Sequence, residues 1–171
     1  ICKMPRQIPY PVTVSFGKPL PTAANAADVR HAVLELGSRA FEHRLTGLKP
    51  LHQYFFRQAQ RQWRTSAVVD STGARLSYGR LATASILVSH RLRNVLPIDK
   101  HVAVLLPPGA AGVIANLALL FDGRVPVNLN YSLGRGVIDQ ICADAGITKI
   151  ITARKMLDAL KWGDDPRMVF M

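Results

Sequence analysis

The sequence predicts an α/β fold, with a partial, largely parallel sheet and crossover helices that follow a separate strand and helix. The first observation is that short apolar runs alternate with amphipathic helical segments from residue 66 onward. This strand, helix, strand order implies right-handed crossovers between parallel strands. The second observation is composition, because 49% hydrophobic and 19% charged residues are typical of a packed chain.

The front of the chain predicts one strand and one helix. Residues 8–16 alternate apolar and polar side chains after the prolines, which predicts a strand beginning at Val12. A helical period then runs from Asn25, the expected N-cap, to about Arg44. Val29, Val33, Leu36 and Ala40 are expected on one face of this helix. The breaker at residues 46–50 predicts a boundary, so we divide the chain into domains 1–46 and 47–171.

The second domain opens with a helix and a hairpin. Residues 51–63 have helical period, and the side chains expected toward a core are Leu51, Tyr54, Phe55 and Ala59. Residues 67–70 and 75–78 predict two strands around a Ser-Thr-Gly turn. A helix over residues 79–94 follows, with Ser77 as its N-cap. The inner face of that helix is expected to carry Leu81, Ala84, Val88 and Leu92.

Alternating strands and helices then complete the predicted sheet. Strands are expected at residues 102–106, 125–129 and 149–152, and helices at residues 110–121 and 135–145. The uncharged run 102–121 has the length of a membrane span, but Pro107, Pro108 and Gly109 interrupt it. We therefore interpret this run as strand, turn and helix, and expect no transmembrane segment.

The positive charge of the chain does not identify a binding partner. The net charge is +11, and residues 1–65 hold ten Lys and Arg against three acidic residues. Such a bias favours nucleic acid or an anionic membrane face, although a solvated helix surface accounts for it equally well. The two cysteines, Cys2 and Cys142, match no metal or disulfide spacing, which favours a reducing compartment.

Motif searches yield no catalytic residue and no metal ligand. None of the five histidines begins a His-x-x-x-x-Asp, and Gly-x-Ser-x-Gly, Cys-x-x-Cys, His-Glu-x-x-His and P-loop patterns are absent. Gly109-Ala-Ala-Gly112 opens a helix after a strand, where amides bind anions, but it lacks the first glycine of the dinucleotide fingerprint. We interpret it as a plain turn.

Asn128, Asn130 and Tyr131 are the candidates for a binding cleft. They follow the carboxyl end of a predicted parallel strand, where ligands bind in open α/β sheets. Side chains that form turns are the commoner explanation for such residues.

Two stretches resemble known families. Pro11-Val-Thr-Val-Ser-Phe-Gly-Lys-Pro-Leu-Pro21, followed by Ala27-Asp-Val-Arg30 and Glu35-Leu-Gly37, resembles the C-terminal end of a lysophospholipid acyltransferase domain. In that family the catalytic His-x-x-x-x-Asp lies far upstream, so here it would precede Ile1.

The second stretch resembles the start of the adenylate-forming superfamily, which activates carboxylic acids with ATP. The matching segments are Ser77-Tyr-Gly-Arg-Leu81, His101-Val-Ala-Val-Leu-Leu-Pro-Pro108 and Gly123-Arg-Val-Pro-Val-Asn-Leu-Asn130. Arg80, Pro108 and Arg124 depart from the commonest Glu, Asn and Ala, and these changes resemble those of a fused subfamily. Because both resemblances occur in one chain, the sequence is similar to fused acyltransferase and acyl-acyl carrier protein synthetases of the 2-acylglycerophosphoethanolamine acyltransferase type.

This resemblance implies an enzyme that activates fatty acids with ATP and magnesium, loads acyl carrier protein and acylates a lysophospholipid. It implies a location at the cytoplasmic face of a bacterial inner membrane. The phosphate loop, the nucleotide contacts and the catalytic lysine lie downstream in that superfamily, so we expect no catalytic residue and no tight cofactor binding within this chain. Because the sequence begins with Ile1 and lacks an initiating Met, we expect it to be part of a longer protein.

The alternative from a different class is a self-contained basic α/β module that binds nucleic acid, or a small nucleotide-binding protein. No aromatic and basic interleaving of a known nucleic-acid motif is present, which makes nucleic acid the less favoured partner. A sheet that continues beyond the chain also predicts an unpaired edge, so the isolated chain is expected to be marginally stable or prone to associate.

Overall fold

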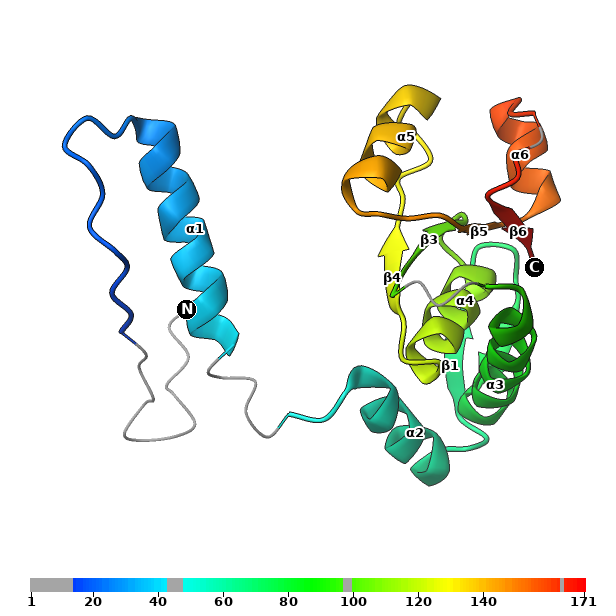
Figure 1. The fold of residues 1–171 in the computed structure, drawn as a ribbon. Coiled ribbons are helices and arrows are strands. Elements are labelled where there is room, and N and C mark those ends of the chain that lie inside the picture. Colours follow the sequence, from blue (N-terminus) through cyan, green and yellow to red (C-terminus); the bar gives the residue numbers. More distant parts are fainter. Residues whose placement is uncertain (1–13, 43–47, 97–99, 164) are drawn as a thin grey trace. The chain divides into compact units, whose positions relative to one another are not determined.

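The computed structural model describes residues 14–42, 48–96, 100–163 and 165–171. The chain divides into two compact units, unit 1 (Ile1–Lys49) and unit 2 (Pro50–Met171). Within the described residues, unit 2 holds both sheets and all eleven helices and strands that follow α1. Figure 1 draws the elements with the labels used below.

Unit 1 contains the helix α1 (Ala26–Glu42), as predicted. Asn25 is its N-cap, because the Asn25 Oδ1 atom accepts hydrogen bonds from the backbone N–H groups of Ala27 (2.8 Å) and Asp28 (3.0 Å). The Asp28 carboxylate accepts in turn from the Asn25 N–H at 3.0 Å. This reciprocal capping fixes where the helix begins.

One prediction for unit 1 is wrong within the described residues. Residues 14–16 of the expected strand are not in a strand, and its start at Val12 lies outside the described part of the chain. The apolar face of α1 is not buried, since α1 has no buried residue and Val33 is 62% exposed. The physical reason is the same for both: the described part of unit 1 offers neither a partner strand nor a second apolar layer.

Unit 2 begins with α2 (Leu51–Arg61), followed by the antiparallel hairpin of β1 (Ser66–Val69) and β2 (Arg75–Ser77). The predicted hairpin is confirmed. The helix α3 (Tyr78–Val95) follows directly, and the Ser77 hydroxyl caps it by accepting from the Arg80 N–H at 3.3 Å. The prediction for α2 is half wrong: Ala59 is buried and Phe55 half-buried, but Leu51 and Tyr54 are exposed.

The larger sheet has four parallel strands in the order β4, β3, β5, β6. The strands and helices that were predicted for it are present as β3 (His101–Leu105), α4 (Ala110–Phe121), β4 (Val125–Asn128), α5 (Arg135–Asp144) and β5 (Ile150–Thr152). Two further elements, α6 (Arg154–Leu160) and β6 (Met168–Phe170), were not predicted from the sequence. Both are short, so neither shows a clear period.

Two apolar clusters pack on opposite faces of β3, because successive side chains of a strand point to opposite sides. Val102 and Val104 belong to the cluster formed with α3 and α4. Ala103 and Leu105 belong to the cluster formed with α5. This double cover explains why β3 reads as a continuous apolar run. Among the residues that the structure describes, no helix is long and apolar enough to cross a membrane.

Candidate binding pocket

A cavity of about 570 Å³ opens where β3 and β4 end. The two strands are paired in parallel, with Val104 opposite Asn128, so their carboxyl ends meet at one edge of the sheet. The turn after β3 and the turn after β4 form two walls, and α4 forms a third. The lining residues are Leu51, Val104, Leu106, Pro107, Pro108, Gly109, Gly112, Val113, Asn116, Leu117, Leu120, Asn128, Leu129, Asn130 and Tyr131.

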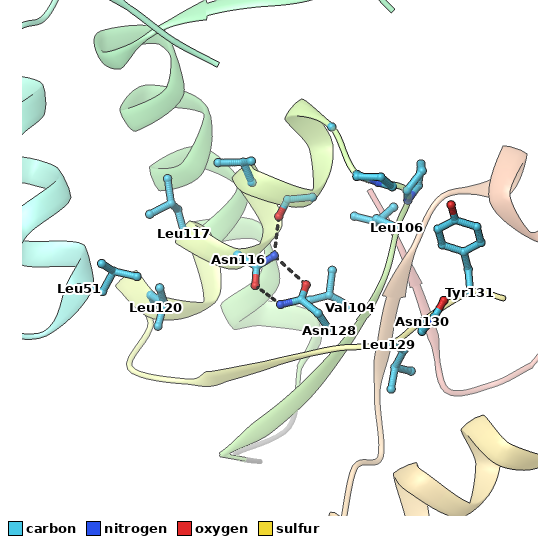
Figure 2. A pocket seen from close by; sticks show the side chains of 15 residues that line it. Leu51, Val104, Leu106, Asn116, Leu117, Leu120, Asn128, Leu129, Asn130 and Tyr131 are labelled. Atoms are coloured by element: carbon cyan, nitrogen blue, oxygen red, sulfur yellow. Dashed lines mark hydrogen bonds between the residues drawn. The ribbon is translucent and has the colours of Figure 1, made fainter. Parts of the chain in front are cut away.

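Asn116 and Asn128 join α4 to the end of β4. The Asn116 Nδ2 atom donates to Asn128 Oδ1, and the Asn128 Nδ2 atom donates to Asn116 Oδ1, both at 2.9 Å. Asn116 Nδ2 also donates to the carbonyl oxygen of Gly112 at 2.7 Å. Figure 2 shows the two amides pointing toward one another. This reciprocal pair fixes the orientation of both side chains in the pocket wall.

The structure brings the three residues that were singled out from the sequence to this pocket. Asn130 forms its turn, because its Oδ1 atom accepts from the N–H (3.0 Å) and the hydroxyl (2.8 Å) of Ser132. Tyr131 is 42% exposed, and Asn128 makes the amide pair with Asn116. All three line the pocket, and a role for them in binding stays a prediction.

The helix α4 contributes a pocket wall that was not predicted from the sequence. Val113, Asn116, Leu117 and Leu120 all line the pocket. They stand at positions i, i+3, i+4 and i+7, which is the spacing of one helix face. That periodicity was visible in the sequence, but nothing in it indicated that this face borders a cavity.

The first turn of α4 is occupied by a carboxylate of the chain itself. Asp70 Oδ2 accepts from the Ala110 N–H at 3.2 Å, while Asp70 Oδ1 accepts from the Thr72 hydroxyl (2.6 Å) and the Ala74 N–H (3.1 Å). The hydrogen bond from the Thr72 hydroxyl, and then that from Ala110, lowers the pKa of Asp70 below its usual value. Residues 109–112 therefore form a strand-to-helix turn in which the Ala110 N–H already donates to the Asp70 carboxylate.

The pocket lining suits an apolar group and does not fit ATP with magnesium. It contains no Lys, Arg, Asp or Glu, and its polar side chains are three amides and a phenol. A triphosphate requires cationic side chains or a phosphate loop, and magnesium requires carboxylate ligands. Within the described ranges no group of three or more His, Cys, Asp and Glu residues is placed to hold a metal ion.

Unit 2 is an open α/β domain: its parallel sheet is covered by helices on both faces, and a pocket lies at the carboxyl ends of two strands. Comparison with known families makes this specific. The AMP-binding enzyme family matches residues 55–168, and the chain therefore belongs to that family.

Solved structures share this fold. The nonribosomal peptide synthetase FmoA3, in its AMPPNP-bound form, is 26% identical with a TM-score of 0.62, over 70% of this chain and 13% of that one. The N-terminal subdomain of Klebsiella oxytoca NpsA is 22% identical with a TM-score of 0.62, over 72% of this chain and 31% of that one. The inhibitor-bound N-terminal domain of FACL13 from Mycobacterium tuberculosis is 20% identical with a TM-score of 0.61, over 72% and 34%.

These matches confirm the predicted fold class, the N-terminal part of an adenylate-forming domain. This chain spans between 13% and 34% of the length of those three solved chains. They also favour an adenylate-forming fragment over a self-contained basic binding module.

Proposed function

We propose that this chain is part of a longer enzyme that activates fatty acids with ATP and magnesium as acyl-acyl carrier protein and acylates a lysophospholipid. Membership of the AMP-binding enzyme family over residues 55–168 carries the activation half of the proposal. The acyltransferase half is supported by the resemblance of residues 11–37 to the end of a lysophospholipid acyltransferase domain, in a unit separate from the matched one.

The apolar pocket supports an acyl chain over a polar acid as the group held near this sheet edge. Its walls are mainly apolar side chains from α4 and from the turns after β3 and β4, and its amides are already paired or engaged in a turn. Burial of apolar surface contributes roughly 25 cal/mol per Å², so such walls favour a hydrocarbon. The residues that handle ATP are expected elsewhere in the parent protein, since this lining does not fit it.

The test compares the parent protein with residues 1–171 alone. We expect the parent to load a radiolabelled fatty acid on acyl carrier protein with ATP and magnesium, and then to acylate a lysophospholipid. The 171-residue chain is expected to do neither. A panel that includes amino acids and aryl acids serves as the substrate control.

Two results would contradict the proposal. One is pyrophosphate exchange by the parent with amino or aryl acids but not with fatty acids. The other is ATP-dependent loading of acyl carrier protein by residues 1–171 alone, which would place the catalytic groups inside this chain.

A further inference from the structure

The pocket at the ends of β3 and β4 extends along α4. Val113 and Leu120 both line it and are seven residues apart on this helix. At a rise of 1.5 Å per residue, the α4 wall between them is about 10 Å long. A wall of this length suits an extended chain rather than a single compact group.

The two ends of the pocket differ in polarity. Figure 2 shows Asn130 and Tyr131 on one side of the pocket and Leu51 and Leu120 on the other, with the paired amides between them. Burial of a polar group is costly unless the group is hydrogen-bonded. A ligand with one polar end therefore places that end near Tyr131 and its apolar end beside the two leucines.

The position of Leu51 is fixed by the packing of α2 on α4. The rings of His52 and Phe55 lie 6.0 Å and 6.3 Å from the ring of Phe121. Because Phe121 directly follows Leu120, these contacts hold the first turn of α2 at the end of the α4 wall. The apolar end of the pocket is thus built on two helices, which position side chains more precisely than loops do.

Leu51 is 67% exposed although it borders the pocket. An apolar side chain in this position gains burial when a ligand covers it. The described residues that line the pocket include no charged side chain, so a hydrocarbon matches this rim better than an ionic group does. Tyr54, the next exposed apolar residue of α2 that points away from the pocket lining, has no such contact.

We propose that Leu51 and Leu120 form the tail end of an acyl-binding groove and favour fatty acids that are long enough to reach both leucines. The inference rests on the proposed function and deepens it, because that function makes the ligand of the pocket an acyl chain. Each methylene that becomes buried improves affinity about fourfold. Affinity is therefore expected to rise with chain length until the chain reaches the leucines and to level off beyond them.

The experiment is equilibrium dialysis of the 171-residue chain against radiolabelled hexanoate, laurate and palmitate. Hexanoate is too short to span the α4 wall, so we expect laurate and palmitate to bind far more tightly. L51A and L120A are each expected to weaken laurate on the order of tenfold, which corresponds to one or two buried methylenes, and to leave hexanoate unchanged.

Two further variants separate the apolar contact from a folding defect. L51M keeps an apolar side chain of similar size and is expected to retain the preference for laurate. Y54A removes an exposed side chain of the same helix that does not line the pocket, so it is expected to change neither affinity. Thermal unfolding of L51A and Y54A should be alike, since both positions are exposed.

Three results overturn the inference: no binding of laurate, an equal loss for hexanoate and laurate in L51A, or the same loss in Y54A as in L51A. Dialysis uses no ATP, acyl carrier protein or lysophospholipid. Fatty-acid activation by the parent without a leucine-dependent length preference would end this inference alone, whereas length-dependent binding without activation would end the proposed function alone.

Discussion

At the scale of single residues, Gly79 shows how packing selects a side chain. It is buried at the start of α3, and a Cβ atom built there would lie 2.4 Å from Cε2 of Trp63. The Gly79 N–H also donates to the Trp63 carbonyl oxygen at 2.9 Å. The close approach of the indole requires a residue without a side chain.

We therefore expect G79A to destabilise the chain by about 1–3 kcal/mol, because Trp63 must move outward. Urea unfolding measures the loss, and tryptophan emission in a W162F background reports the movement of Trp63. The control is G136A in α5, where a Cβ atom meets nothing within 4 Å. If G79A were as stable as G136A and the emission of Trp63 did not change, this account would be refuted.

At the scale of elements, one carboxylate ties the hairpin to the next helix. Asp70 closes the turn between β1 and β2 through Thr72 and Ala74, and its second oxygen accepts from the first N–H of α4. An acidic group at a helix N-terminus is favourable. Two elements about forty residues apart are thereby held by one side chain.

D70A is expected to lower the midpoint of urea unfolding and to speed amide exchange in the first turn of α4, because Ala110 loses its acceptor. D70N keeps one acceptor oxygen, so its unfolding midpoint and its exchange rate at Ala110 should lie between those of D70A and those of the unchanged chain. If D70A left exchange at Ala110 unaltered, the link between hairpin and helix would be wrong.

At the scale of the whole unit, an ion cluster attaches the last strand to α5. Asp165, whose side chain is 4% exposed, accepts from Arg167 at 2.6 Å and from Arg135 at 2.9 Å. The hydrogen bond from the Arg167 guanidinium outweighs burial and lowers the pKa of Asp165 from 3.8 to about 2. The cluster lies beside β6, which is one of the two edge strands of the sheet.

Because the folded-state pKa of Asp165 is below its unfolded value, its contribution to stability is present above pH 3.8 and is lost as the pH falls toward 2. D165N is therefore expected to destabilise the chain by about 1–3 kcal/mol at pH 7. Urea unfolding from pH 7 to pH 2 should show the difference shrinking below pH 4. D158N, at an exposed position of α6, is the control, and a difference that stayed constant with pH would contradict the assignment.

Local signals in the sequence were sufficient for most elements of unit 2. The Asn25 and Ser77 caps, the breakers at Pro107 to Gly109 and the apolar period of α3 and α4 all act over a few residues, so they can be read without the fold. The short elements α6 and β6 lack such signals. Their position depends on pairing with β5, where Ile151 lies opposite Val169.

Sequence patterns alone are sufficient for the α/β class, the order of the strands from β1 to β5 along the chain and the family resemblance of residues 77–130. The fold was needed to establish which apolar residues are buried and which remain exposed, as Val33 of α1 and Tyr54 of α2 do. It also decided that Asn116 of α4 meets Asn128 after β4 in one pocket wall. The physical reason is that period and capping are local, whereas burial and pocket formation depend on which elements the sheet brings together.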